Sequence, residues 1–594
     1  MYLPYSYTKL AGAALRMTIG SAPTAAARPS RLSGVGRALG LQIALGSCAA
    51  LIALAAALAP ARVLAQGVRS DRTTYRPGID VLDYHFRIDF PARPPIGAIN
   101  VTAEIALRRT APVDTLVLDL LAPMQVSDVS VNSAPARFTR DSSTVRIALP
   151  GGSGDSLAVA LRYRGAPADG LVIRTDSAGR WTAFGDNYPD RARHWLATVD
   201  HPSDKATVSW DVRAPLGSRV VANGDLIEES PETAPAGATP MVLTRWRTNR
   251  PIYTAVMVIG VAPFAVFELG ASACSLSEFP GCVRQSVWVA PETRSTLPGA
   301  FARAGDIVAF FARLVAPFPY EKLAHVMSAT RYGGMENAGA IFYADGIFRR
   351  NAMSESLIAH ETAHQWFGDA VTETEWPHVW LSEGFATYFA ALWTEFSQGE
   401  SAFVAEMKRS RDQLVKTPLT ASEPIVRAAV PDLGKLLNSN VYGKAGYTLH
   451  MLRGEIGDSA FFRGLRSYYL KYRHGNALTA DLQRELEASS GAKLDWFFEQ
   501  WLYRPGFAEL TVSWRYDEAR RAMSITVGQS ERFQPYRLTM PIEITTASGR
   551  VIRTSVHVNA SRVSTQPLTV PLDGPPRTVS FDPDASLLAT ISAK

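Results

Sequence analysis

The chain has 594 residues and a formal net charge of +6, from 61 Lys and Arg residues against 55 Asp and Glu residues. The first 65 residues contain six of the basic residues and no acidic residue, so the rest of the chain holds 55 of each sign and is close to neutral. A near-neutral chain without a basic patch is not typical of a nucleic-acid-binding protein. Hydrophobic residues make up 47% of the sequence, enough for several buried cores, and the length beyond the first 65 residues predicts roughly three or four domains.

Residues 1–65 have the character of a leader that directs export. Arg37 is followed by a long apolar stretch, and the small residues that end it suit signal-peptidase cleavage after Ala65. Two alternatives remain open. Residues 39–59 are long enough to stay in a membrane as an uncleaved anchor, and Cys48 lies in a weakly lipidation-like sequence. We expect an exported protein in the periplasm, the cell envelope or the medium.

The apolar pattern of the remaining chain changes twice. From 66 to 268, short segments such as STVRIALP and SLAVALRYRG are separated by Gly, Pro, Asp and Ser, which predicts an all-β N-terminal domain. From 269 to 505 the apolar residues recur at the helical period, which predicts an α-rich domain. From 506 to 594 short strand-like segments return and predict a small C-terminal β-sandwich. The expected fold is therefore multidomain α+β.

Cysteine usage agrees with export. Beyond the leader, cysteine occurs only at Cys274 and Cys282, in the segment ASACSLSEFPGCV. We expect these two residues to form a disulfide that closes a short loop in an oxidising compartment. Two separate buried thiols are the alternative.

Residues 360–364 read HETAH, inside the helix-like segment SESLIAHETAHQWFG. His360 and His364 share one helix face and predict a metal site, with Glu361 beside the open side of the metal. Glu383 lies in a second helix-like segment, WLSEGFATYFAALW, which can deliver a third ligand. Two His and one Glu leave the fourth position of a tetrahedral zinc ion open for water, as in catalytic sites. The alternative is two surface histidines on an ordinary amphipathic helix.

These motifs resemble those of the aminopeptidase N family of zinc metallopeptidases, the gluzincin aminopeptidases. The likeness rests on HETAH followed after eighteen residues by EGFA, on GGMEN at 333–337 and on YGKA at 442–445. The segments FPYEKL, HQWFGDAVT and FFEQWLYRPG match as well, and the spellings GGMEN and WPHVW are closest to the leukotriene hydrolase branch. The resemblance extends from about residue 75 to the C-terminus. It implies a thermolysin-like catalytic domain that holds one Zn²⁺ per chain.

The resemblance also assigns roles that spacing alone does not select. It implies that Glu361 is the general base and that the Tyr442 hydroxyl stabilises the oxyanion. It implies that the GGMEN segment binds the substrate, with Glu336 on the N-terminal ammonium group. The residues of this segment are Gly333, Gly334, Met335, Glu336 and Asn337. The family's second amine contact falls near Tyr188, where the sequence departs from the family pattern, and Asp186 is our candidate for it.

We therefore expect a zinc-dependent aminopeptidase that removes single residues from peptides with a free N-terminus. A zinc endopeptidase of thermolysin type and a non-catalytic binding scaffold of the same fold are the alternatives. The expected partners are such peptides and no nucleic acid, with a membrane only if the leader is retained as an anchor. The sequence carries no signal for an oligomeric state.

Overall fold

A computed structural model describes residues 76–594 except for 92–96, 152–155, 177, 234–238, 297–298, 431, 569 and 571. These residues belong to one compact unit, Arg69–Lys594. The expected leader, residues 1–65, lies outside the described residues. Within the described part, no helix combines the length and the apolar character needed to cross a bilayer.

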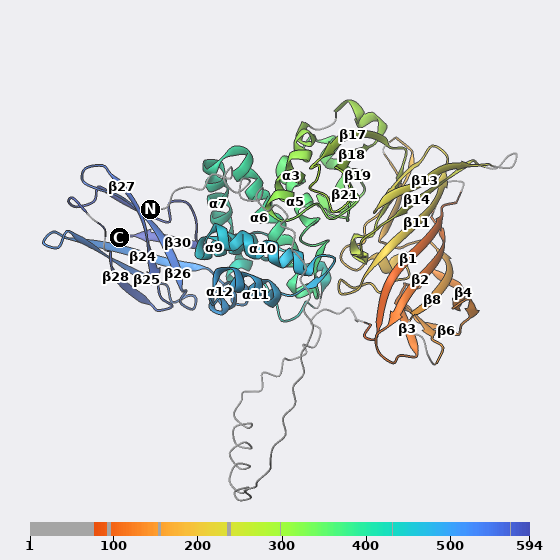
Figure 1. Ribbon diagram of the computed structural model, residues 1–594, viewed down its shortest axis with the longest axis horizontal. Coiled ribbons are helices and arrows are strands. Elements are labelled where there is room, and N and C mark those ends of the chain that lie inside the picture. Colours follow the sequence, from red (N-terminus) through yellow and green to blue (C-terminus); the bar gives the residue numbers. More distant parts are fainter. Residues whose placement is uncertain are drawn as a thin grey trace, which may run out of the picture. The chain divides into compact units, whose positions relative to one another are not determined.

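Between residues 79 and 262 the regular elements are nearly all strands, most of them in one nine-stranded sheet (Figure 1). In β2 (Ile99–Arg109) buried residues alternate with more exposed ones, so that one face of the strand is apolar. β1 (Ile79–Asp89) pairs antiparallel with β2 and parallel with β11 (Lys205–Pro215). The sheet continues on both sides with β14 (Met241–Arg247), β13 (Asp225–Glu232), β8 (Ser156–Gly165), β4 (Gln125–Val131) and β5 (Ala134–Pro135), and β15 (Ile252–Tyr253) pairs with β11.

Two smaller sheets complete this β-rich region. One contains β12 (Arg219–Ala222), β16 (Ile259–Ala262), β10 (Trp181–Gly185) and β9 (Leu171–Thr175). The other contains β3 (Thr115–Asp119), β7 (Thr144–Ala148) and β6 (Phe138–Arg140). A loop after β10 carries residues 186–191, which reach the candidate site described below.

A five-stranded sheet follows, in the order β17, β18, β19, β21, β20. β17, which spans the expected domain boundary at residue 268, pairs antiparallel with β18 and so belongs to this sheet. β20 forms one edge and runs antiparallel to β21. The strands are β17 (Ala265–Ser272), β18 (Val283–Val289), β19 (Lys322–Ser328), β20 (Gly334–Met335) and β21 (Ala340–Ala344).

The helices of the central region gather beside this sheet (Figure 1). α5 (Glu355–His364) and α6 (Trp380–Gln398) pack together, and directly after α5 the Phe367 ring stacks on Phe385 of α6 with centroids 4.3 Å apart. β22 (Val371–Glu373) pairs in parallel with β23 (Gly475–Ala477). The other helices are α3 (Ala304–Leu314), α4 (Asp345–Arg349), α7 (Glu400–Leu414), α8 (Pro418–Ser422), α9 (Ala445–Ile456), α10 (Asp458–Tyr472), α11 (Thr479–Ser490) and α12 (Asp495–Leu502).

The last part of the chain forms two further sheets. β26 (Leu538–Thr545) alternates strictly between buried and half-buried residues, as expected for a strand with one face on a core. It lies between β27 (Val551–Val558) and β29 (Thr578–Phe581). The second sheet contains β28 (Val563–Leu568), β25 (Ala522–Gln529), β24 (Ala508–Asp517) and β30 (Ala589–Ala593). The predicted α+β class is confirmed, with a β-rich N-terminal region and an α-rich region that follows it.

A half-buried lysine connects the large sheet to the loop that follows the helix of the HETAH motif. Lys205, the first residue of β11, donates hydrogen bonds to the carbonyl oxygens of Asp369 and Ala370 at 2.8 and 3.0 Å. Those carbonyls lie in the loop that follows α5, so the β-rich region fixes the position of this loop. Burial lowers the pKa of Lys205 to about 7.

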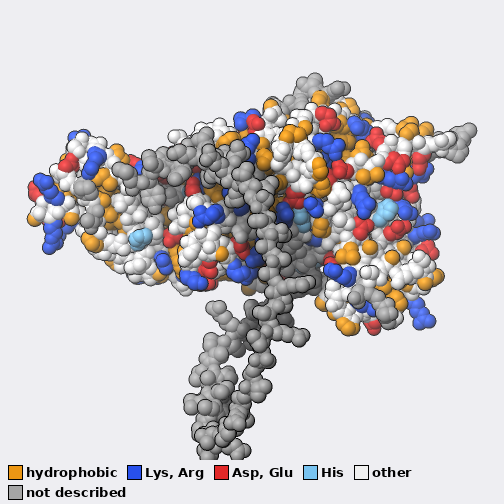
Figure 2. Space-filling model, viewed as in Figure 1, with side chains coloured by type: hydrophobic (Ala, Val, Ile, Leu, Met, Phe, Trp, Pro, Cys, Tyr) orange, Lys and Arg blue, Asp and Glu red, His pale blue; other side chains and the backbone are white. Residues whose placement is uncertain are grey.

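On the outer surface, Lys and Arg side chains are interspersed with Asp and Glu side chains over the face shown in Figure 2.

The structure joins Cys274 and Cys282 by a disulfide, as expected from the sequence. The loop that it closes carries Glu278, whose carboxylate forms ion pairs with His474 at 2.9 Å and with Arg473 at 3.0 Å. These pairs hold the loop against the start of β23. The disulfide therefore restrains a segment that also makes tertiary contacts.

Replacing both cysteines with serine is expected to destabilise the protein by about 2–3 kcal/mol, because the unfolded chain then regains the entropy of a short closed loop. The midpoint of urea unfolding measures this. A thiol reductant should lower the midpoint of the wild type and leave that of the Cys274→Ser, Cys282→Ser variant unchanged. Equal midpoints for oxidised and reduced wild type would contradict the expectation.

Candidate active site

The two histidines of the HETAH motif lie on one face of α5, as their spacing requires. Their Nε2 atoms are 3.2 Å apart, and Oε2 of Glu383 lies 3.4 Å from each of them. The N-cap residue Ser354 accepts a hydrogen bond from the Leu357 amide and starts the helix. The helix ends at His364, four residues before Gly368. Two ring nitrogens and a carboxylate oxygen thus converge from two helices.

The spacing of these three atoms fits a zinc ion. Zn–N and Zn–O bonds of about 2.0–2.2 Å at tetrahedral angles place neighbouring ligand atoms about 3.3–3.6 Å apart. The separations between His360, His364 and Glu383 are 3.2 to 3.4 Å. The Oε2 atom of Glu383 is buried and has no hydrogen-bond partner among the described residues. A buried acceptor without a donor, beside two imidazole nitrogens, suits a metal cation.

Neighbouring groups orient His364 for ligation. Its Nδ1 lies 3.2 Å from the carbonyl oxygen of Phe367 and 3.0 Å from the hydroxyl of Ser382. A proton on Nδ1 donated to the carbonyl leaves the lone pair of Nε2 directed at the metal position. Gly368 permits this close approach. It has a φ of 122°, and a Cβ there would lie 2.4 Å from the Ser382 hydroxyl.

Buried carboxylates give the site a strongly negative field. Burial raises the pKa of Glu336 and that of Glu361. Burial alone would also raise the pKa of Glu383, but contacts with the two imidazoles outweigh it and lower the pKa to about 2. Burial opposes a charge on His364, yet the surrounding carboxylates prevail and raise its pKa. The field that draws a proton to His364 equally favours a metal cation at this position.

Tyr442 lies beside the three ligand candidates. It belongs to a π-helical turn, Asn440–Lys444, that leads into α9, and such turns occur frequently at functional sites. Its hydroxyl donates a hydrogen bond of 2.7 Å to Oε1 of Glu383, and its ring stacks on His360 with centroids 6.0 Å apart. Burial raises the pKa of Tyr442, and the charge of Glu383 raises it further, so the phenol remains a donor.

The edge strand β20 brings the GGMEN segment to the same place. A Cβ on Gly334 would lie 2.0 Å from Oε1 of Glu361, so only glycine allows the strand to pass so close to this carboxylate. Ligand atoms of Glu336, Glu361 and His364 lie within 4.8 Å of one another. Asn337 differs from expectation. It is fully buried and does not line the cavity, so the structure does not support its predicted contact with the substrate.

Gln365 fixes the position of Glu336, a role that the sequence analysis did not assign. Its side-chain nitrogen donates to the carbonyl oxygen of Glu336 at 2.9 Å, and its side-chain oxygen accepts from the Gly339 amide at 2.8 Å. Gln365 follows His364 directly, so this one residue connects the end of α5 to the GGMEN segment. The only signal in the sequence was its place within HQWFG.

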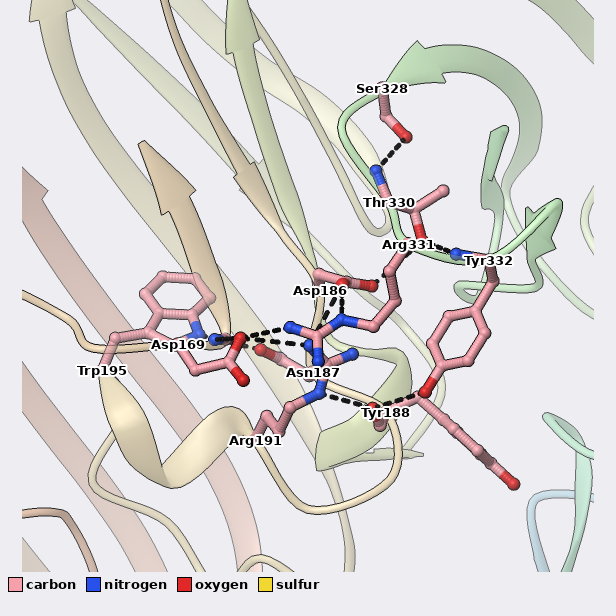
Figure 3. A network of polar contacts seen from close by, with 11 residues as sticks. Asp169, Asp186, Asn187, Tyr188, Arg191, Trp195, Ser328, Thr330, Arg331 and Tyr332 are labelled. Atoms are coloured by element: carbon pink, nitrogen blue, oxygen red, sulfur yellow. Dashed lines mark hydrogen bonds and ion pairs between the residues drawn. The ribbon is translucent and has the colours of Figure 1, made fainter. Parts of the chain in front are cut away.

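The second amine contact is not at Asp186. Figure 3 shows this carboxylate inside an ionic network, where it pairs with Arg191 and Arg331 at 3.1 Å each and accepts from the Thr330 hydroxyl at 3.0 Å. The side chain is only 1% exposed. The carboxylate oxygens of Asp186 are therefore already occupied. The prediction that Asp186 binds the substrate's amine is wrong, because its side chain is buried and paired within the protein.

Tyr188 takes the place that we expected for that contact. Its ring extends away from the network in Figure 3 and lies edge-on to Trp376, with centroids 5.6 Å apart. The carbonyl oxygen of Tyr188 accepts hydrogen bonds from Arg191 at 2.7 Å and from the Tyr332 hydroxyl at 3.3 Å. Its own hydroxyl is buried without a hydrogen-bond partner among the described residues.

These groups surround one cavity of about 490 Å³. Two of the three metal-ligand candidates, the general-base candidate Glu361 and residues 333–336 of the GGMEN segment contribute to its wall. The lining residues are Tyr188, Tyr332, Gly333, Gly334, Met335, Glu336, Ser354, Ser356, Leu357, His360, Glu361, Glu383, Thr387, Ala390, Glu406, Leu437 and Tyr442.

Comparisons with known proteins agree with this geometry. Residues 302–501 match the Peptidase family M1 domain. Aminopeptidase N of Streptomyces lividans is 29% identical over 66% of this chain and 46% of its own length, and a leucyl aminopeptidase of Saccharolobus solfataricus is 24% identical over 67% of this chain and 51% of its own length. The chain thus spans about half the length of the curated relatives it matches.

Solved structures match over a larger share of their length. An M1 zinc metallopeptidase from Deinococcus radiodurans superposes with a TM-score of 0.61 at 25% identity, over 72% of this chain and 94% of that one. A mutant of that enzyme bound to a Tyr-Ser-Ala substrate gives a TM-score of 0.62 at 26% identity, over 72% and 95%. The spelling likeness to the leukotriene hydrolase branch stays a prediction. Residues 302–501 are thus similar to the peptidase family M1 domain, and the two-histidine, one-glutamate group that they contain agrees with the predicted aminopeptidase N-like gluzincin family.

Proposed function

We propose that this protein is a zinc-dependent aminopeptidase that hydrolyses the first peptide bond of peptides with a free N-terminus. One observation carries the proposal: a three-residue metal group and a buried carboxylate, Glu336, lie a few ångströms apart in one cavity. The first provides for hydrolysis and the second for recognition of an amine. The names of the relatives and of the solved neighbours support the same activity.

Zinc is the cofactor that the family and the donor set indicate. His360, His364 and Glu383 are the residues that would hold it. When bound, the ion supplies Lewis acidity, which acidifies water and polarises a carbonyl group. The remaining chemistry belongs to side chains of the chain itself.

Glu361 moves the proton. Its carboxylate lines the cavity next to the metal group, with room made by the absent side chain of Gly334. It accepts a proton from the attacking water and returns it to the nitrogen of the leaving amine. Burial raises the pKa of Glu361, which favours its acceptance of a proton.

Tyr442 stabilises negative charge on the scissile carbonyl oxygen. Its hydroxyl donates to Glu383 in this structure, at the edge of the metal group. To donate to the substrate, the single O–H of Tyr442 turns from Glu383 to the carbonyl oxygen, and this rotation leaves the ring in place.

Glu336 binds the substrate's ammonium group and so restricts cleavage to the chain end. The backbone of Gly333 and Gly334 forms the adjacent wall, where an extended substrate passes closely. Tyr188 supplies the second contact, because its buried hydroxyl lacks a partner in the described part of the chain and the residue lines the same cavity. Tyr332 and Met335 add apolar surface for the first side chain.

Three substitutions separate metal binding from catalysis. Glu383→Gln is expected to lose both zinc and activity, because it removes a charged ligand. Glu361→Gln should keep one zinc per chain and lose activity, and Tyr442→Phe should keep zinc and lower kcat by roughly 10²–10³-fold. Metal content by mass spectrometry and hydrolysis of aminoacyl-nitroanilides measure the two properties.

Tyr503→Phe is the matched control for Tyr442→Phe, because Tyr503 is 41% exposed and does not line the cavity. It should retain wild-type kcat. Full activity of Glu361→Gln would show that the hydrolysis arises elsewhere.

Blocking the substrate's amine tests the exopeptidase assignment. N-acetylated peptides should resist cleavage that the free peptides undergo. Glu336→Gln should lower kcat/KM for free peptides by roughly 10- to 100-fold, the range of a charge-assisted hydrogen bond. Equal cleavage of blocked and free peptides would instead favour an endopeptidase of thermolysin type.

We also propose that the protein is exported. The apolar leader sequence and the disulfide between Cys274 and Cys282 support this, because structural disulfides persist in oxidising compartments. Fractionation of producing cells should find the protein outside the cytoplasm with its leader either removed or retained in a membrane. Recovery of reduced protein from the cytoplasm alone would refute export.

A further inference from the structure

The cavity extends beyond the metal group. We call the part at Glu336, where the substrate's ammonium group binds, the amine end, and the opposite part the far end. Ligand atoms of Glu336 lie near those of His364, in the last turn of α5. The opposite part of the cavity is lined by Ser356 and Leu357, from the first turns of the same helix. Leu357 precedes His364 by seven residues, about 10 Å of helical rise. The amine end and the far end therefore lie on opposite sides of the metal group.

α6 follows the same course. Thr387 and Ala390 come four and seven residues after Glu383, about 6 and 10 Å along this helix, and both line the cavity. Leu437 and Glu406 also line the cavity, and Glu406 is contributed by α7. In a substrate whose ammonium group is at Glu336, this far end receives the part of the peptide that follows the scissile bond.

The charges of the lining are unbalanced at the far end. Among the described lining residues there are four glutamates and neither Lys nor Arg. Glu361 and Glu383 act at the metal group and Glu336 faces the substrate's ammonium group, so each of these three has a positive counterpart in the complex. Glu406 has none, and within the described part of the chain no hydrogen bond or ion pair engages its partly exposed side chain.

We propose that Glu406 makes the enzyme selective for peptides with Lys or Arg in the first two positions after the scissile bond. An extended peptide advances about 3.3 Å per residue, so these two residues span most of the distance from the metal group to the far end. A long basic side chain covers the remainder. Because Glu406 is only partly exposed, the resulting ion pair is screened less than one between fully exposed groups. This inference rests on the proposed aminopeptidase function.

Four tetrapeptides test the selectivity: Leu-Arg-Gly-Gly against Leu-Gln-Gly-Gly, and Leu-Gly-Arg-Gly against Leu-Gly-Gln-Gly. Release of leucine, followed by chromatography, gives kcat/KM for each peptide. The wild type should prefer arginine over glutamine by roughly tenfold in at least one pair. The preference should shrink as salt is added.

Two variants identify the residue responsible. Glu406→Gln should reduce the arginine-to-glutamine ratio to about one, and Glu406→Lys should reverse the preference towards Leu-Glu-Gly-Gly. Glu400→Gln is the matched control, because Glu400 is an exposed residue at the start of the same helix and does not line the cavity. It should keep the wild-type ratio. Each ratio comes from one preparation, so a loss of folded protein cancels.

The outcomes separate this inference from the proposed function. If the wild type hydrolyses the four peptides without an arginine preference, or if Glu406→Gln retains the preference, the assignment of Glu406 is overturned while the aminopeptidase activity stands. If the wild type releases no leucine from any of them but cleaves other peptides internally, the proposed function itself fails.

Discussion

The site depends on how closely α6 packs between α5 and α9. A Cβ on Gly384 would lie 2.7 Å from the Cβ of Ala445 at the start of α9, so a glycine is needed where these two helices meet. This contact sets the distance between Glu383, the residue before the glycine, and Tyr442, just ahead of α9. α6 also meets the segment directly after α5 through the stacked rings of Phe367 and Phe385.

The same packing buries several acidic groups at a cost to stability. Besides the glutamates of the cavity, Glu373 is almost fully buried with both carboxylate oxygens lacking hydrogen-bond partners among the described residues, and burial raises its pKa to about 8. Asp369 is also buried, and burial raises its pKa. Groups of this kind weaken a fold unless a cation offsets them. Their concentration around one point marks the place where function, not stability, has set the residue types.

The sequence predicted what local periodicity determines. His360, His364 and Glu383 were identified because residues four apart share a helix face and because both segments are strongly helical. The disulfide followed from two cysteines in one short loop. Long-range placement was not predictable in this way: Asp186 and Tyr188 are two residues apart, and only the tertiary contacts of Arg191 and Arg331 decide which one lines the cavity. Asn337 was misplaced for the same reason, since the turn after β20 buries it. The place of Glu406 in the cavity was not predictable, because the sequence of α7 contains no motif and only helix packing brings this residue to the cavity.

The position of β20 at the border of its sheet has a consequence for what can be digested. One side of this strand pairs with β21, and the side facing the cavity is not shared with another strand of the sheet. Backbone groups on such a border align an incoming chain only when that chain is itself stretched out. A terminus coiled into a helix or held in a compact domain cannot form that ladder. In the proposed aminopeptidase, an extended terminus is therefore required before side-chain identity matters, which favours loose fragments over intact folded proteins as substrates.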